Sequence, residues 1–301
     1  MDVSIIYVHT NEEDEILASL VSVREWTRAF GYEVIVSDNA SAQGTQRMQL
    51  DSGIRLIFGS ENRGFGAGCN RGARHASGRY LLFLNPDTRF RNNVVAELVR
   101  FLDSHPLAAA AAPMLVDEHD NARCNGVQPL PTLFNEFLHH STLTFRFPRC
   151  SWTPKPYQSG WDHCSTREVE SVIGACLMVR SEVFHSIGGF DEAFFLYSED
   201  LDLCCRIRKA GHQVWYVHTG RVTHEEHHTT AQVLGSVSRI ALQNMRSQHY
   251  YFRKHRGKAV AFVWRHMIAT LYLCRYLFGG NKMDLEYLRY VKWAVTAPPT
   301  T

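Results

Sequence analysis

Short apolar runs alternate with helical segments along the first half of the chain. Apolar runs bounded by polar residues, glycine or proline predict buried strands at residues 3–8, 33–37, 54–58 and 80–84. Apolar positions at helical spacing predict helices at 12–30, 65–76 and 93–104. Alanines 108–112 favour a helix by propensity, but their place after a helix and before Pro113 favours another strand. The alternation predicts an α/β fold with a mostly parallel twisted sheet flanked by helices.

The pattern changes twice further along the chain. Periodicity is lost at about 128–166, where prolines alternate with aromatic residues, and this segment is either a binding surface or lid, or a surface excursion that packs its aromatics on itself. Regular patterns return with a strand at 169–179, a helix at 199–210 and a strand at 213–217, and residues after 231 are helical and basic. We therefore expect a catalytic-type domain at 1–230, with halves at about 1–115 and 116–230, followed by a C-terminal helical region at 231–301.

Composition narrows the class of protein. A chain of 301 residues with 45% hydrophobic residues has material for a real core, and a net charge of +2 is too small to indicate nucleic-acid binding. The first residues form a predicted strand and carry no signal-peptide pattern, so we expect a cytoplasmic protein. Eight scattered cysteines without a Cys-x-x-Cys pair indicate reduced thiols. The longest apolar stretch, 259–278, contains Arg265, His266 and Arg275, which argues against a spanning helix.

Asp87 is the most informative candidate residue. It follows the apolar run Tyr80–Leu84 and Pro86, and Pro86 cannot continue the hydrogen-bond ladder of a strand. Asp87 is thereby expected at the carboxyl end of a buried strand, where open α/β sheets bind ligands and where a carboxylate can hold a cation against a phosphate.

Asp38 and Asn39 follow an earlier predicted strand. A carboxylate at that place can accept from a pyrimidine N–H or a ribose hydroxyl, although turn chemistry at a strand end accounts for the same residues.

A glycine-rich loop begins at Asn62 and leads into a predicted helix. Glycines allow close backbone approach to a ligand, and the free amides of a helix start suit a diphosphate. A tight turn is the competing interpretation, and the glycine spacing does not match a dinucleotide fingerprint.

Glu199 and Asp200 form an acid pair at the start of the predicted helix 199–210. Acids are favoured in a first helical turn by the helix dipole alone. The aromatic residues at 194–197 that precede the pair favour a second interpretation, in which one carboxylate is a general base that removes a proton from a bound hydroxyl.

His224 begins a segment that formally matches the zinc-protease pattern His-Glu-x-x-His. That motif needs a helix with both histidines on one face and a further ligand downstream, but the β-branched Val222 and Thr223 precede His224 and no acid follows Glu226 until Asp284. We interpret His224 as a partner of Asp87, with a solvated polar turn as the alternative for His227 and His228.

Taken in this order, the motifs resemble the inverting family 2 glycosyltransferases of the GT-A fold, in particular the rhamnosyltransferase-like branch. The resemblance runs from Ser4 to about Thr229. Its most specific parts are Asp38-Asn39-Ala-Ser41, Asn62-Arg-Gly-Phe-Gly66, Asn70-Arg-Gly72, Asn85-Pro-Asp87, Gly188-Gly-Phe-Asp-Glu192 and Phe195-Leu-Tyr-Ser-Glu-Asp-Leu-Asp202.

The resemblance implies roles for individual residues. It makes Asp200 the catalytic base, and Glu199 either orients the acceptor or supports that base. Asp87 and His224 would bind a divalent cation, Mg²⁺ or Mn²⁺. The resemblance places the following residues along the nucleotide sugar, with Asp38 on the pyrimidine: Thr10, Asn11, Asp38, Asn39, Asn62, Arg63, Gly64, Gly66, Asn70, Asn85 and Asp87. Asn85 replaces the first acid of the common Asp-x-Asp motif, so weak or dispensable metal binding is an open alternative.

The function implied is transfer of a sugar, specifically L-rhamnose from dTDP-L-rhamnose, to a glycan or lipid-linked glycan in bacterial surface polysaccharide assembly. The alternatives are another donor sugar, an inactive binding or scaffold protein on the same fold, and a zinc protease. Homo-oligomerisation is left open.

The basic C-terminal region predicts an interfacial helix at 259–278. On a helical wheel one face carries Val260, Val263, Met267, Leu271, Cys274 and Phe278, and the opposite face carries Lys258, Arg265, Tyr272 and Arg275. Such a helix suits the surface of an anionic membrane, with the protein peripheral on the inner face of the plasma membrane. A helical hairpin packed on the catalytic domain or on a second subunit is the alternative.

Overall fold

The computed structural model describes residues 1–42, 45–117, 119–123, 126–141, 161–224, 237–278 and 291–294. The chain forms two compact units. Among the described residues, the first unit comprises 1–42, 45–117, 119–123, 126–130, 161–195 and 199–224, and the second comprises 131–141, 196–198, 237–278 and 291–294.

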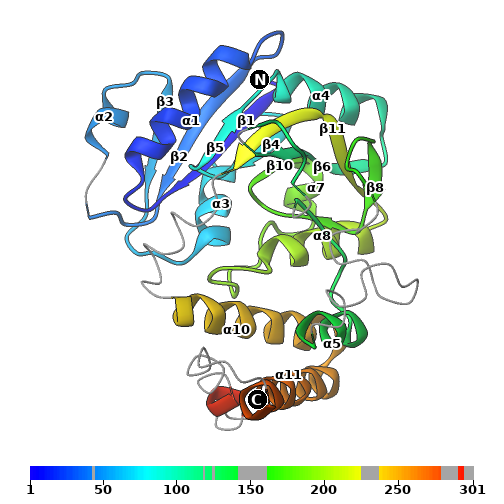
Figure 1. The fold of residues 1–301 in the computed structure, drawn as a ribbon. Helices are drawn as coiled ribbons and strands as arrows, with labels where there is room; N and C mark the ends of the chain where they lie inside the picture. The colour runs from blue at the N-terminus through cyan, green and yellow to red at the C-terminus, as the bar shows by residue number, and fades with distance from the viewer. Residues whose placement is uncertain are drawn as a thin grey trace. The chain divides into compact units, whose positions relative to one another are not determined.

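A twisted sheet forms the centre of the first unit (Figure 1). Its strand order is β3-β2-β1-β4-β10-β6-β11-β5, with β8 paired to β11, and β7 pairs β9 in a small second sheet. The strands are β1 Val3–His9, β2 Tyr32–Asp38, β3 Ile54–Phe58, β4 Tyr80–Leu84, β5 Thr88–Phe90, β6 Ala108–Val116, β7 Val127–Gln128, β8 Arg167–Val169, β9 Ser171–Val172, β10 Cys176–Arg180 and β11 Gln213–His224. The four strands predicted for the first half of the chain and the strand over the alanines are confirmed.

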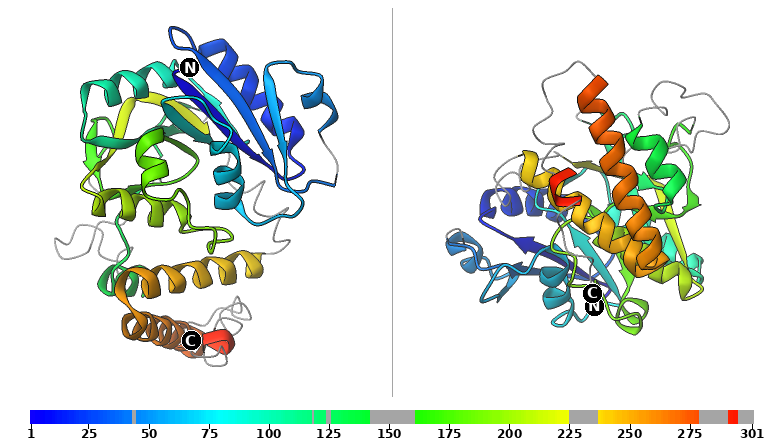
Figure 2. Two further views of the ribbon diagram at one scale, coloured as in Figure 1. Left: turned by 180° about the vertical axis from the view of Figure 1, so that it is seen from behind. Right: turned by 90° about the horizontal axis from the view of Figure 1, so that it is seen from below.

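Helices cover both faces of this sheet because its strands are apolar on both sides. Along β1, Ile5 and Tyr7 belong to one hydrophobic cluster and Ile6 and Val8 to another. The first cluster is completed by α1 Glu13–Trp26, α2 Gln46–Gln49 and α4 Val94–Ser104, and the second by α3 Phe65–Ala73, α7 Ser181–Ser186 and α8 Glu199–Lys209 (Figures 1 and 2). The predicted α/β class with a helix-flanked sheet is confirmed.

The sheet is more mixed than the alternating pattern predicts. β1 is parallel to β2 and β4, but β10 is antiparallel to both β4 and β6. β11 continues well past residue 217 to His224, and a register irregularity between Val217 and Arg221 lies where it passes Pro113 of β6. Proline cannot donate to a ladder, so a bulge in the neighbouring strand allows β6 to continue through Pro113.

The second unit is helical and has its own core. It contains α5 Leu133–His140, which lies in the segment where the sequence pattern indicated only a loop, together with α10 Val237–Arg256 and α11 Lys258–Phe278. Its core packs Trp264 and Ile268 of α11 against Met245 and Phe252 of α10. Figure 2 shows α10 and α11 as two successive helices that cross each other. No helix in the described part of the chain is long and apolar enough to cross a membrane.

The predicted boundary at residue 230 and the two halves of the first domain stay predictions. The helical unit takes in residues 131–141 and 196–198, which precede that boundary. Residues 142–160 of the aromatic segment at 128–166, together with His227 and His228, lie outside the described residues.

Candidate active site

The carboxyl ends of the central strands place several predicted residues at one edge of the sheet. Asp38 is the last residue of β2, and Asp87 follows β4 by three residues. His224 is the last residue of β11, and it pairs with Thr88, the residue after Asp87, in the antiparallel ladder with β5. The register of this ladder therefore carries His224 to Asp87, which the chain separates by more than a hundred residues.

Asp87 and His224 form a close pair. The Nε2 atom of His224 lies 3.3 Å from Oδ1 of Asp87, and their side chains are only 11% and 5% exposed. Neither Oδ1 of Asp87 nor Nδ1 of His224 has a hydrogen-bond partner. A carboxylate and an imidazole that face each other fit a divalent cation whose remaining ligands are phosphate and water oxygens. The donor set thus fits Mg²⁺ or Mn²⁺, and within the described part of the chain no third His, Cys, Asp or Glu joins the pair.

His224 lies on a strand, which differs from the helix that the zinc-protease pattern requires. The motif requires both histidines on one helix face, whereas His224 ends the twelve-residue strand β11. The prediction that this segment is not a zinc-protease motif agrees with this placement.

Three acids occupy the first turn of α8, and each has different partners. Asp202 is fully buried and accepts from Nε of Arg206 at 2.7 Å. Asp200 accepts from the backbone amides of Gly174 at 3.0 Å and Leu201 at 2.7 Å. Glu199 is 7% exposed, and its Oε2 atom has no hydrogen-bond partner. Asp202 therefore stabilises the helix, while Glu199 and Asp200 retain capacity for chemistry.

Burial shifts the ionisation of the acid pair. Burial raises the pKa of Asp200, and burial together with the charge of Asp200 raises the pKa of Glu199 to about 8. Glu199 is therefore protonated at neutral pH, and its carboxyl can donate a hydrogen bond. Such a pair presents a proton acceptor beside a neutral hydrogen-bond donor.

The residues before the pair have an unusual backbone. Tyr197 and Ser198 have φ angles of 69° and 66°, in the left-handed region that non-glycine residues rarely adopt. Within the second unit, the carbonyl of Leu196 accepts from Oγ of the buried Ser247 at 2.7 Å. Strain of this kind persists only where surrounding structure holds it, and it occurs often at functional sites.

The main chain of two consecutive residues, Gly174 and Ala175, connects the acid pair to the loop of Asp87. The amide of Gly174 donates to Asp200, and the carbonyl of Ala175 accepts from the amide of Asn85 at 2.9 Å. Neither Gly174 nor Ala175 stands out in the sequence, because their contribution is made by the backbone and leaves no side-chain signal. The turn at Gly174 and Ala175, directly before β10, thus fixes the two candidate reactive elements relative to each other.

The glycine loop packs against the segment that leads to the acid pair. A Cβ atom at Gly64, whose φ is 94°, would lie 2.0 Å from the carbonyl oxygen of Phe195, and one at Gly66 would lie 3.0 Å from Cβ of Phe190. Asn70 donates to the carbonyl of Phe190 at 2.8 Å and accepts from its amide at 2.9 Å. Close packing by itself accounts for these three residues, and their predicted contact with the nucleotide stays a prediction.

Asp38 and Asn39 have internal partners. The carboxylate of Asp38 accepts from the amide of Ser41 at 3.2 Å and lies 4.0 Å from Nε2 of the buried His9. Asn39 donates to the carbonyl of Gly64 at 2.9 Å, while its Oδ1 atom has no hydrogen-bond partner. The turn chemistry considered for the strand end is present, and it leaves Asp38 at the sheet edge together with Asp87.

The remaining predicted residues lie in loops around this edge. Thr10 and Asn11 follow β1, and the amide of Asn11 donates to Oγ of Ser41 at 3.0 Å. Asn62 caps its own turn by accepting from the amide of Gly64, and Arg63 pairs with Glu192 at 3.2 Å. Asn62 and Arg63 are exposed, so their side chains are accessible to a ligand.

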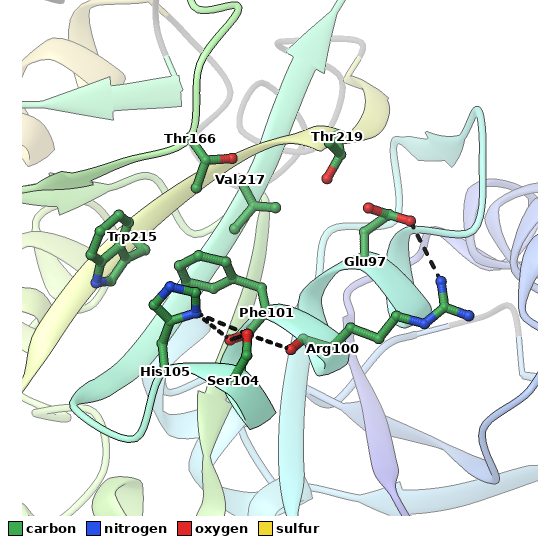
Figure 3. A pocket seen from close by; sticks show the side chains of 9 residues that line it. All are labelled: Glu97, Arg100, Phe101, Ser104, His105, Thr166, Trp215, Val217 and Thr219. Atoms are coloured by element: carbon green, nitrogen blue, oxygen red, sulfur yellow. Dashed lines mark hydrogen bonds and ion pairs between the residues drawn. The ribbon is translucent and has the colours of Figure 1, made fainter.

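A separate hollow of about 490 Å³ lies between α4 and β11 (Figure 3). Phe101, His105 and Trp215 contribute its aromatic wall, and the rings of Phe101 and His105 stack 4.1 Å apart. None of the predicted site residues lines it, and Glu97 is its single acid. We assign no chemistry to this hollow.

The pKa of Glu199 gives a first testable prediction. A carboxyl whose pKa is raised on folding stabilises the fold below its ordinary pKa and loses that contribution as the pH rises toward 8. The amide of Glu199→Gln does not ionise. As the pH rises from 5 to 8.5, we therefore expect the unfolding free energy of the variant to increase relative to that of wild type by on the order of a few kcal/mol. Urea unfolding at the two pH values measures this gain.

The control for this measurement is Glu25→Gln, because Glu25 is exposed. It should leave the pH dependence of stability as in wild type. An identical pH dependence for Glu199→Gln and wild type would contradict a raised pKa at Glu199.

Comparison with solved structures identifies the fold. The mannosyltransferase PcManGT from Pyrobaculum calidifontis, solved with GDP-Man and Mn²⁺, matches with a TM-score of 0.56 and 16% identity over 99% of this chain and 81% of that chain. GalNAc-T7, solved with UDP, GalNAc and Mn²⁺, matches with a TM-score of 0.55 and 16% identity over 85% of this chain and 51% of that chain. S. aureus TarS 1–349 with UDP-GlcNAc matches with a TM-score of 0.56 and 14% identity over 98% of this chain and 79% of that chain.

Sequence comparison reaches the same class of protein. The glycosyl transferase family 2 pattern matches residues 4–188, and the pattern described as the N-terminal domain of galactosyltransferase matches residues 160–228. The N-acetylglucosaminyl-diphospho-decaprenol L-rhamnosyltransferase of Mycobacterium tuberculosis is 28% identical over 237 residues, 74% of this chain and 76% of the relative. The rhamnosyltransferase WbbL of Escherichia coli is 27% identical over 220 residues, 71% of this chain and 80% of the relative.

These likenesses and the acid-bearing sheet edge define a glycosyltransferase with a GT-A-like fold. More narrowly, the chain belongs to glycosyl transferase family 2 and is similar to its rhamnosyltransferases.

Proposed function

We propose that the protein transfers L-rhamnose from dTDP-L-rhamnose to a hydroxyl of a lipid-linked glycan, with inversion, during assembly of a bacterial surface polysaccharide. One observation carries the choice of donor and acceptor class: two rhamnosyltransferases, one of them named for a diphospho-decaprenol acceptor, match about three quarters of this chain and of themselves. We also propose that the transfer takes place in the cytoplasm, at the inner face of the plasma membrane.

The acid pair supplies the proton transfer in this proposal. Asp200 takes the proton of the acceptor hydroxyl as its oxygen bonds to the anomeric carbon, and the bond from that carbon to the diphosphate breaks, with its electron pair leaving on the diphosphate. The raised pKa of Asp200 strengthens it as a base. Glu199, neutral below about pH 8, orients the acceptor through a hydrogen bond.

Asp87 and His224 hold a divalent cation in this proposal. Such an ion, when bound, offsets the charge that develops on the departing diphosphate. Fixing the ion is the task of Asp87 and His224, whose facing atoms lie 3.3 Å apart. Asp38, Asn39 and the residues of the glycine loop lie along the nucleotide in the proposed donor complex.

A panel of donors tests the proposal. The purified protein is given dTDP-L-rhamnose, UDP-glucose, UDP-N-acetylglucosamine or GDP-mannose together with a lipid-linked N-acetylglucosaminyl diphosphate, and nucleotide release is measured with and without Mn²⁺. We expect turnover with dTDP-L-rhamnose at least about tenfold above the other donors. A different preferred donor would replace rhamnose, and release from no donor would favour a binding protein on this fold.

A further inference from the structure

The helix α11 exposes a continuous apolar face among the described residues. Phe262 is 57% exposed, Val263 50%, Leu273 39% and Leu277 61%. Ala259, Thr270 and Cys274 are exposed as well, and the half-buried His266, whose ring packs on Phe262, is a titratable residue on this side of the helix. At 3.6 residues per turn these exposed residues fall on one side of the helix and extend over nearly its whole length.

This face shares Val263 and Cys274 with the apolar face that the helical wheel predicted, but Val260, Met267 and Leu271 pack against the core instead. Arg265 and Tyr272 were expected on the polar side, yet they are 6% and 7% exposed because the core of the helical unit takes in that side of α11. Trp264 donates to the buried Glu136 at 3.3 Å, and the hydroxyl of Tyr272 lies 3.0 Å from Nδ1 of His140. Pairing with α5 thus satisfies polar groups inside and leaves Phe262, Val263, Leu273 and Leu277 outside.

Positive charge lies at one end of this apolar face. The sequence from Val237 to Phe278 contains no acidic residue. Lys254 and Arg256 at the end of α10 and Lys258 at the start of α11 are exposed. An apolar helix face with exposed cations beside it complements a surface of negatively charged headgroups over acyl chains.

We propose that the exposed face of α11 and the cations Lys254, Arg256 and Lys258 dock the protein onto an anionic membrane surface. The cations favour this occupant over a second copy of the chain, because a second copy has no acid on α10 or α11 to pair with them. The role of docking rests on the proposed function, since it would bring the site to an acceptor held in the membrane.

Flotation of the full-length protein with phosphatidylcholine vesicles, with and without 30% phosphatidylglycerol, tests the proposal. We expect binding to anionic vesicles only, and weakening by added salt. The double variant Phe262→Ser/Leu277→Ser should bind at least about tenfold more weakly, because its side chains no longer insert. The matched control is Leu50→Ser/Leu107→Ser, which removes two leucines that are 87% and 62% exposed on the first unit and should bind as wild type.

The electrostatic part is tested separately. Lys254→Gln/Arg256→Gln/Lys258→Gln should lose about a hundredfold in vesicle affinity, roughly fivefold for each cation. Arg28→Gln/Arg74→Gln/Arg91→Gln removes the same charge from exposed positions of the first unit and should bind nearly as wild type.

Three results would overturn the proposal. The first is failure of the full-length protein to bind anionic vesicles. The second is unchanged binding by both Phe262→Ser/Leu277→Ser and Lys254→Gln/Arg256→Gln/Lys258→Gln. The third is a concentration-dependent dimer in light scattering that Phe262→Ser/Leu277→Ser abolishes. The last result would assign the face to a second copy. Vesicle binding needs neither donor nor acceptor, so its outcome is independent of the transferase assay.

Discussion

Asp200→Asn should abolish transfer while leaving affinity for the nucleoside diphosphate near that of wild type. The amide side chain of asparagine keeps the shape of Asp200 and has one acceptor oxygen. It can therefore keep one of the two hydrogen bonds that Asp200 accepts from the backbone amides of Gly174 and Leu201. It cannot take a proton, and loss of a general base lowers turnover by about 10²–10⁴-fold. Steady-state turnover with the preferred donor and titration with the nucleoside diphosphate measure the two effects.

The control for Asp200→Asn is its thermal unfolding curve together with turnover by Glu199→Gln. Asp200→Asn should unfold near the wild-type temperature or above it, since it removes a charge that burial disfavours. Glu199→Gln should retain more activity, because its amide can still donate a hydrogen bond. Turnover by Asp200→Asn at the wild-type rate would remove Asp200 from the role of base.

Asp87→Ala and His224→Ala should each raise the Mn²⁺ concentration needed for half-maximal activity by at least about tenfold. The expectation follows from the 3.3 Å separation of Oδ1 of Asp87 and Nε2 of His224, because both atoms can reach the same ion. Calorimetric titration of the nucleoside diphosphate in the presence and absence of Mn²⁺ measures the same loss without turnover. Affinity measured without the metal should change little.

The matched controls for the metal pair are Asp14→Ala and His75→Ala. Both residues are exposed on the first unit, where Asp14 pairs with Arg47, and their metal titrations should overlay that of wild type. Metal titrations that stay unchanged for both Asp87→Ala and His224→Ala would show that these residues do not form the cation site.

The parts of the fold predicted from the sequence are those with strong local signals. Continuous apolar runs such as Tyr80–Leu84 predict buried strands between covered faces, and the structure contains a buried strand there. The antiparallel insertion of β10 has no local signal, because strand direction is set by partners distant in the sequence. Arg265 and Tyr272 of α11 were predicted on the outward polar side but are buried. Helical spacing shows two faces with apolar residues and does not show which of them packs against a partner.

The candidate site also contains residues that the sequence predicts and residues that it does not. Asp87, Glu199 and Asp200 have ionisable side chains, and their positions at strand and helix ends follow from local pattern. His224 was singled out by its residue type, but the strand predicted to end at residue 217 continues to it. The contribution of the backbone at Gly174 and Ala175 could not be predicted, because it depends on which amide and carbonyl meet Asp200 and Asn85 in space. For Gly64 and Asn70 the residue types are informative, but the same types suit both a ligand cradle and close packing against Phe190 and Phe195.

In the proposed mechanism, the main chain of the adjacent residues Gly174 and Ala175 couples proton transfer to leaving-group stabilisation. A shift of this short stretch of main chain alters the setting of Asp200 and of the Asn85–Asp87 loop together. The energetic costs of changing Asp87 and Asp200 are therefore not additive, and a double-mutant cycle across them carries a nonzero interaction energy.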